Sequence, residues 1–539
     1  MTQPADLVFR GGPVFRADAA RSWARAVAVD SGRIVAIGGE RNVDGLIGPQ
    51  TRVVDLDGRL LAPGFQDAHV HPGTAGRTML QCDLSAARDR DEVETLIAGY
   101  AANHPDERWV TGGGWRFDCF VRGMPTKELL DALVPDRPAY LRVADGHAGW
   151  ANSRAFEAAG IDRTTPDPAF GRIERNHDGS PQGTVQEGAM GLVERAMPAN
   201  GPVDVERALL TAQEHLISLG ITAWQDAAVD QALHEAYVRL AWEGRLRVSV
   251  RGAHWWEPQD GLGQLEGFEE RRAQSVGTYD AGSVKLMLDG VCENFTARML
   301  LPYLDESGRA TDNTGSDHID PGELPATVTE VMRRGFQPHF HALGDAAVRG
   351  ALDAIEAASV ELGPTDLRPH LAHIQVVDPV DVPRFRRLGA VANAQALWAC
   401  HDDAMDDLTL PYLDPSSRAN QYPFRSILDA GGTLAMGSDW SVTTPDVMAQ
   451  VDAAVTRRVI GDDGRPPFLP GERIAVADAM AGFTAGSAFV NHLDADRGTI
   501  RPGAVADLVV LDGNPFEAGE ISGIRVGMTV IGGEVVYER

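Results

Sequence analysis

The chain has 539 residues, of which 43% are hydrophobic and 23% charged, proportions that are ordinary for a globular protein with a large core. Its net charge of −28 argues against nucleic acids and anionic membranes as partners, because both require clusters of basic side chains. The sequence shows no signal peptide and no apolar run long enough to cross a bilayer, and its four cysteines form no CxxC pair, so we expect a reduced cytoplasmic protein.

Both ends of the chain contain short segments in which apolar and polar residues alternate between glycine turns. This pattern predicts β-strands, and neither end is long enough for a sheet core of its own. We therefore expect residues 1–62 and 499–539 to build one small β-sandwich together. The expected strands lie at 7–9, 26–29, 33–37, 52–56, 506–511, 527–531 and 534–537.

Residues 63–498 contain strand-like and helix-like segments in alternation. Such alternation favours an α/β fold, a parallel (β/α)8 barrel of the TIM type. A doubly wound sheet is the alternative, but no GxGxxG motif follows an early strand. Amphipathic helices are expected at 203–219 and 346–362. The expected strands lie at 221–226, 247–251, 283–288, 337–341, 371–374, 390–394 and 433–438.

The stretch from Leu80 to Asn200 does not follow this alternation of strands and helices. It is rich in glycine, proline and tryptophan, which is a composition more typical of loops and of a separate subdomain than of barrel repeats. We therefore expect an insertion at about residues 80–200 that forms a lid over the mouth of the barrel.

Two histidines just after a Pro-Gly turn are the first sign of a metal site. His69 and His71 are two residues apart on an expected strand, so their side chains point to the same face and can hold one ion together. Imidazole nitrogen is a common zinc ligand. Further donors occur on later strand-like segments, near the ends where barrel enzymes place their chemistry: Lys285, His339, His341, His373 and Asp439.

The order of these residues resembles that of the amidohydrolase superfamily of metal-dependent hydrolases. Residues 63–71 are similar to its first-strand signature, and residues 497–512 resemble its closing segment. Within the superfamily, three segments resemble the YtcJ-like branch, also called amidohydrolase family 3, which includes N-substituted formamide deformylase. They are residues 146–155, 285–290 and 341–347.

This resemblance implies two divalent ions, most simply zinc. Two histidines and the aspartate would hold the more buried ion, two further histidines the second, and a carboxylated lysine would bridge both. The implied ligands are His69, His71, Lys285, His341, His373 and Asp439. Burial lowers the pKa of a lysine, and the neutral amine can add carbon dioxide. The alternative is that Lys285, one of only two lysines in the chain, reaches from a strand end toward solvent.

Two residues are candidates for catalysis. Asp439 can take a proton from a metal-bound water and pass it to the leaving amine, although an aspartate here can also cap a following turn or helix. His147, in the expected insertion, can polarise the substrate carbonyl or simply pack in its loop, and the sequence leaves both interpretations open.

Other polar and aromatic residues are assigned supporting or binding roles. His339 shares a face with His341, but the family motif matches His341, so we expect a supporting or core role for His339. His370 is expected to be structural. Three tryptophans are candidates for lining a pocket around an apolar or aromatic substituent: Trp115, Trp255 and Trp440.

The resemblance implies a metal-dependent amidohydrolase that cleaves a carbon–nitrogen bond other than a peptide bond through a metal-activated hydroxide. The most concrete substrate is a small linear amide, such as an N-substituted formamide, and a homodimer is expected at the level of the family. Alternatives on the same site are hydrolysis of a cyclic amide, ester or carbamate, and deamination with one metal. No His-x-x-Glu pattern follows His341, which favours two metals. A catalytically silent scaffold is a third alternative, but no expected ligand is lost.

Overall fold

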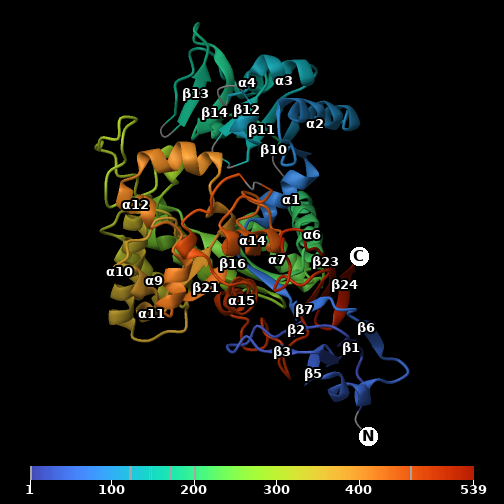
Figure 1. Ribbon diagram of the computed structural model, residues 1–539. Helices are drawn as coiled ribbons and strands as arrows, with labels where there is room; N and C mark the ends of the chain where they lie inside the picture. Colours follow the sequence, from blue (N-terminus) through green and yellow to red (C-terminus); the bar gives the residue numbers. More distant parts are fainter. Residues whose placement is uncertain are drawn as a thin grey trace. The chain divides into compact units, whose positions relative to one another are not determined.

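The computed structural model describes residues 3–120, 124–144, 146, 148–168, 171–198, 202–461 and 464–539, which form two compact units. The first, here called the barrel unit, contains Met1–His71 and Gln213–Arg539. The second, the inserted unit, contains Pro72–Ala212. Figure 1 shows the elements of both units coloured along the chain. None of the described helices is both long and apolar enough to cross a membrane.

Eight parallel strands form the central sheet of the barrel unit, and neighbours in the sheet follow one another along the chain. The two edges of the sheet meet, because the N–H of Asp439 donates to the carbonyl of His69 (2.8 Å) and the N–H of His71 donates to that of Trp440 (2.7 Å). The predicted barrel of the TIM type is therefore confirmed. Its strands are β8 (Phe65–Val70), β15 (Ile221–Val229), β16 (Ser249–Trp255), β17 (Tyr279–Met287), β18 (Gln337–Ala342), β19 (His370–His373), β20 (Val391–Ala394) and β21 (Thr433–Met436).

Helices alternate with these strands, as the sequence predicts. All six residues of β8 and all six of β18 are buried, because a barrel strand is covered by helices on one face and by the barrel interior on the other. Polar side chains that point inward from these strands therefore lie in a water-poor interior. The helices include α6 (Pro202–Ser218), α7 (Gln231–Trp242), α8 (Leu265–Arg272), α9 (Leu324–Arg333), α10 (Asp345–Leu362), α11 (Val382–Leu388), α13 (Phe424–Asp429), α14 (Val447–Thr456) and α15 (Val476–Ala481).

The two ends of the chain share one small β-structure, as the predicted fold class requires. One sheet has the order β5-β4-β1-β6, and the other has the order β24-β23-β22-β7-β2-β3, so it combines N-terminal and C-terminal strands. Side chains of both sheets, among them Phe9, Leu61 and Val510, pack in one buried cluster. The strands are β1 (Leu7–Arg10), β2 (Val14–Phe15), β3 (Trp23–Ala24), β4 (Ala26–Asp30), β5 (Arg33–Gly38), β6 (Arg52–Asp55), β7 (Leu60–Pro63), β22 (Leu508–Leu511), β23 (Val526–Ile531) and β24 (Glu534–Glu538).

The inserted unit has its own six-stranded sheet and its own apolar cores. The unit is longer than the insertion expected at 80–200. It begins with α1 (Pro72–Leu80), which packs against two of its strands, and it ends within α6. Its strands are β9 (Cys82–Asp83), β10 (Val110–Trp115), β11 (Ala139–Val143), β12 (Ala148–Ala151), β13 (Gly171–Arg175) and β14 (Pro181–Glu187). Its further helices include α2 (Arg90–Asn103), α3 (Lys127–Leu133), α4 (Ser153–Ala159) and α5 (Met190–Glu194).

The closure of the barrel depends on the absence of a side chain at Gly437. A Cβ atom there would lie 2.7 Å from the Cβ of His69 and 2.9 Å from Oδ1 of Asn393. We expect Gly437→Ala to destabilise the fold by about 1–3 kcal/mol, the usual cost of overpacking, and to lower the midpoint of thermal unfolding. Gly45→Ala is the matched control, because a Cβ there meets no atom within 4 Å. Equal midpoints for the two variants would contradict the prediction.

Candidate metal centre

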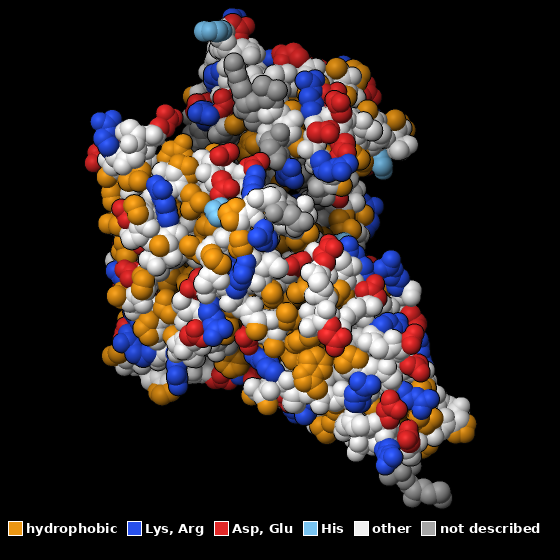
Figure 2. Space-filling view, viewed as in Figure 1, with side chains coloured by type: hydrophobic (Ala, Val, Ile, Leu, Met, Phe, Trp, Pro, Cys, Tyr) orange, Lys and Arg blue, Asp and Glu red, His pale blue; other side chains and the backbone are white. Residues whose placement is uncertain are grey.

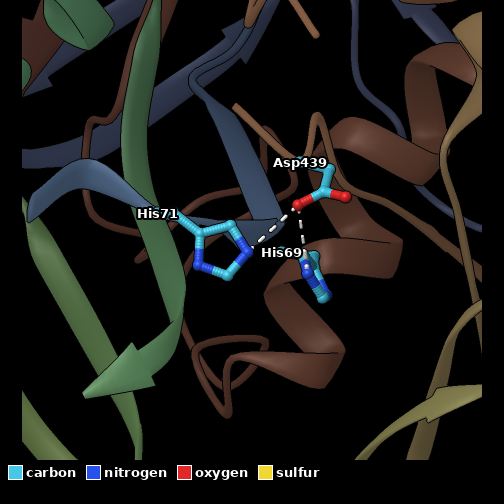
Figure 3. Close-up of side chains that lie close together, drawn as sticks. All are labelled: His69, His71 and Asp439. Atoms are coloured by element: carbon cyan, nitrogen blue, oxygen red, sulfur yellow. Dashed lines mark ion pairs between the residues drawn. The ribbon is translucent and has the colours of Figure 1, made fainter. Parts of the chain in front are cut away.

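Three predicted ligands form a compact cluster where the first and last barrel strands meet. Nε2 of His69 lies 3.4 Å and Nε2 of His71 lies 3.1 Å from Oδ1 of Asp439. Figure 3 shows both imidazoles turned toward this carboxylate oxygen. One donor atom from each residue falls within 4.8 Å of the others, which is close enough for a single ion to contact all three. The side chain of His71 is 25% exposed, whereas the other two are almost fully buried, so His71 marks the open side of the cluster.

Local backbone contacts hold this cluster in place. The backbone hydrogen bonds that close the barrel involve the same residues, His69, His71 and Asp439. Oδ1 of Asp67 accepts hydrogen bonds from the N–H groups of His69 (3.0 Å) and Ser438 (3.1 Å), which ties the two strand ends together a second time. The positions of the donors are therefore fixed by the barrel itself and not by a flexible loop.

The remaining predicted ligands lie on the neighbouring strands. His373, at the end of β19, has its ring centroid 4.9 Å from that of His69 and 4.5 Å from that of His341, which lies near the end of β18. Nδ1 of His373 is 3.9 Å from Oδ2 of Asp439. Lys285, on β17, is buried and interacts electrostatically with Asp439. The structure therefore brings the six predicted ligands together in one region of the barrel interior.

Burial sets the protonation states of these side chains. It lowers the pKa of His69 to about 3 and also lowers the pKa values of His341 and His373. Burial alone would raise the pKa of Asp439, but the adjacent histidines, above all His69, hold it well below its usual range. Burial lowers the pKa of Lys285 to about 7, although Asp439 opposes this shift. At neutral pH the site therefore offers neutral imidazoles, a carboxylate and an easily deprotonated amine, which are the forms that bind metal ions.

The donor set fits a divalent metal ion. Nδ1 of His373 is buried and has no hydrogen-bond partner among the residues that the structure describes. Leaving such a group unpaired costs about 1–3 kcal/mol, and more when it is charged. Divalent ions would satisfy this nitrogen and would also bind the carboxylate of Asp439, because imidazole nitrogen and carboxylate oxygen are the donors that zinc prefers besides thiolate.

Asp289 supports the second group of ligands, and its role was missed in the sequence. Its Oδ1 lies 3.2 Å from Nδ1 of His341 and also accepts the N–H of Leu343 (3.1 Å), while Oδ2 accepts the N–H of Gly344 (2.9 Å). A carboxylate that accepts Nδ1–H fixes the ring and leaves Nε2 free for a metal. The available signal was an aspartate that follows Lys285 by four residues in an otherwise apolar run.

Two other predicted site residues are not found in the described cluster. Trp115 is fully buried in the apolar core of the inserted unit, and its indole N–H donates to the carbonyl of Leu141 (2.9 Å). The prediction that Trp115 lines a pocket is therefore wrong, because its side chain has no accessible surface. His147 lies outside the described residues.

Two of the three candidate tryptophans remain close to the ligands. The backbone carbonyl of Trp440 binds the N–H of His71, and Trp255 is paired in strand register with Lys285. Sequence reasoning did not select Trp398, which is half-buried and stacks on His373 with ring centroids 5.0 Å apart and planes 2° from parallel. Nothing local in the sequence indicates this contact, because the two rings come from different strand ends.

A profile of the amidohydrolase family matches residues 52–537, which is most of the chain. The chain belongs to the amidohydrolase family. This result confirms the resemblance inferred from the sequence motifs and, together with the clustered donors, supports a metal-dependent hydrolase.

Several proteins are similar to this family member over nearly the whole length. Long After Far-Red 3 of Arabidopsis thaliana is 29% identical, with 99% of this chain and 92% of that protein covered. The putative amidohydrolase YtcJ of Bacillus subtilis (strain 168) is 28% identical, with 99% of each covered. N-substituted formamide deformylase of Arthrobacter pascens is 28% identical, with 100% of this chain and 99% of that protein covered. An uncharacterised metal-dependent hydrolase from Pyrococcus horikoshii OT3 shares the fold, with a TM-score of 0.76 at 21% identity over 95% of this chain and 99% of that chain.

The contact between Asp289 and His341 predicts a measurable effect on metal binding. We expect Asp289→Asn to weaken zinc binding about 10–100-fold, because an amide that turns its NH2 toward Nδ1 no longer fixes the ring. The measurement is a competition titration of the metal-free protein with a chromophoric chelator. Asp312→Asn is the control, since Asp312 is exposed. Equal affinities for the two variants would show that Asp289 does not support the site.

Proposed function

We propose that this amidohydrolase cleaves a carbon–nitrogen bond, other than a peptide bond, in a small linear amide such as an N-substituted formamide. The observation that carries the proposal is the convergence of donor side chains from five barrel strands or strand ends, the last of which carries Asp439. The full-length similarity to N-substituted formamide deformylase supports the substrate class. The matches to adenine deaminases cover only 13–15% of the chain, so they support deamination less strongly than the full-length match supports hydrolysis of a linear amide.

We further propose that the site holds two zinc ions and that Lys285 is carboxylated. When bound, divalent ions polarise a carbonyl group and lower the pKa of a water molecule to roughly 7. His69 and His71 with Asp439 would hold one ion, while His341 and His373 would hold the other. A carbamate on Lys285 would carry the negative charge and the two oxygens that a bridge between two cations needs.

Asp439 is the residue we assign to proton transfer. Its carboxylate is ionised at neutral pH, because the adjacent histidines hold its pKa well below the usual range. It can therefore accept the proton of the attacking water and donate it to the departing amine nitrogen. The partly exposed His71 places the open side of the cluster next to this carboxylate, where a substrate can approach.

Aromatic surface near the ligands favours an apolar substituent on the substrate. Trp398 stacks on His373 and, like the half-buried side chains of Phe295 and Tyr412, packs against a buried cluster that includes Tyr303 and Leu343. Trp440 follows Asp439 directly and packs against His215, with ring centroids 5.0 Å apart. Flat apolar side chains beside a polar centre are typical of small-molecule sites.

The proposed partner is a small molecule, and the proposed assembly and location are a homodimer in the cytoplasm. On the face shown in Figure 2, basic side chains are scattered among acidic ones and do not gather into a broad basic patch, which supports a ligand other than nucleic acid. All four cysteines are buried, and none of them is seen in a disulfide bond with another described residue, which suits a reducing compartment.

Metal content and activity test the proposal together. We expect the wild type, purified with bicarbonate and zinc, to hold about two ions per chain and to hydrolyse N-substituted formamides. Lys285→Ala should retain at most one ion and lose most activity, whereas Lys127→Ala, which removes the other lysine, should behave as the wild type. One ion in both wild type and Lys285→Ala, with activity preserved, would overturn the two-metal proposal and bring the single-metal deaminase forward.

The pKa of Lys285 predicts how carboxylation depends on pH. Only the neutral amine adds carbon dioxide, and burial lowers the pKa of Lys285 to about 7. In the metal-free protein the carbamate should therefore form increasingly as pH rises through about 7, at a fixed partial pressure of carbon dioxide. The measurement is the carbamate signal in a ¹³C NMR spectrum with labelled carbon dioxide. The signal should persist in Lys127→Ala and vanish in Lys285→Ala; its presence in Lys285→Ala would assign it elsewhere.

A further inference from the structure

A second histidine lies directly behind a ligand of the candidate metal centre. Nε2 of His339 is 2.8 Å from Nδ1 of His69, and both side chains are almost completely buried. The opposite nitrogen of His69, Nε2, faces Asp439. One imidazole thus contacts the cluster through one nitrogen and another histidine through the other nitrogen.

The chemistry of imidazole links these two contacts. A neutral ring carries its proton on one nitrogen only, and the nitrogen that binds a metal must keep its lone pair. If Nε2 of His69 binds an ion, the proton of His69 is on Nδ1, and that N–H must donate to Nε2 of His339. His339 then carries its own proton on its other nitrogen, Nδ1.

We propose that His339 is a positioning residue for the metal centre, which holds His69 in the tautomer and orientation that direct the Nε2 lone pair at the ion. This inference rests on the proposed function, because it requires that His69 binds a metal. It concerns His339, which would not bind an ion itself but would act through its contact with the ligand His69.

The surroundings of His339 support this role over simple packing. On one side His339 is paired in strand register with Lys285, and on the other side with His370, whose ring centroid is 4.0 Å away. His370 makes its own hydrogen bonds to Gln225 (2.7 Å) and Asn393 (3.2 Å). Nδ1 of His339 is buried and has no hydrogen-bond partner within the described part of the chain. A leucine or phenylalanine would fill such a space without burying an unpaired polar atom, so packing alone does not explain a histidine.

Three substitutions at this one position separate the proposal from a packing role. The side-chain oxygen of glutamine can occupy the place of imidazole Nε2, whereas that of asparagine corresponds to Nδ1 and cannot reach His69. Phenylalanine preserves volume but offers no acceptor. His254→Phe is the control for loss of a buried barrel histidine, because His254 bonds the carbonyl of Ala281 and stacks on Phe268, away from the ligands.

The measurement is the zinc affinity of each metal-free protein by chelator competition, with the thermal midpoint of the metal-free form recorded in parallel. We expect His339→Gln and His254→Phe to bind zinc nearly as the wild type does, and His339→Asn and His339→Phe to bind it about 10–100-fold more weakly. The order of the thermal midpoints of the metal-free proteins should differ from the order of the zinc affinities. Phenylalanine fills the space of the imidazole best, so His339→Phe should lose zinc affinity without a matching loss of stability.

Two results would overturn the proposal, and they differ from each other. If the wild type binds zinc and all three variants at position 339 bind it as tightly as the wild type, His339 only packs, and the proposed function stands. If the wild type binds no divalent metal, the proposed function fails and the role of His339 fails with it.

Discussion

The junction between the first and last barrel strands is the constraint on which the site depends. The backbone of β8 and the segment after β21 are joined by hydrogen bonds at His69, His71 and Asp439, and the side chains of those residues are the clustered donors. Oδ1 of Asp67 binds the N–H of Ser438, 371 residues away along the chain. The hydrogen bonds that close the barrel therefore also place the donor side chains. A change that breaks these hydrogen bonds would also move the donors apart.

This arrangement places polar groups where water cannot satisfy them. Burial keeps the imidazoles of His69, His341 and His373 neutral, and the histidines beside Asp439, above all His69, keep its carboxylate ionised. Unpaired buried atoms such as Nδ1 of His373 reduce the stability of the metal-free fold. Ion binding would therefore contribute to folding stability as well as to chemistry, as is general for sites in which the ligands are preorganised by the fold.

A second layer of residues around the donors controls the orientation of the imidazole rings. Asp289 contacts His341, His339 contacts His69, and Trp398 stacks on His373, so each of these ligand rings has a neighbour that restricts its rotation. Rings that are already aligned lose little entropy when an ion binds, which favours a rigid and selective centre. The aromatic member of this layer also supplies the apolar surface on which the proposed substrate class depends.

The sequence by itself determined the alternation of strands and helices, the pairing of the chain ends in one β-structure, and the candidate ligands. These are local signals: a two-residue spacing puts His69 and His71 on one strand face, and the motif order identified the family. Only the tertiary structure decided which side chains support the ligands and where the tryptophans lie. His69 and His339 are 270 residues apart, and His341 and Asp289 are 52 apart, so no local pattern encodes their contact. Trp115 illustrates the same limit, because a tryptophan near a strand end fills a core or lines a pocket according to what packs around it, and that is set by the whole fold.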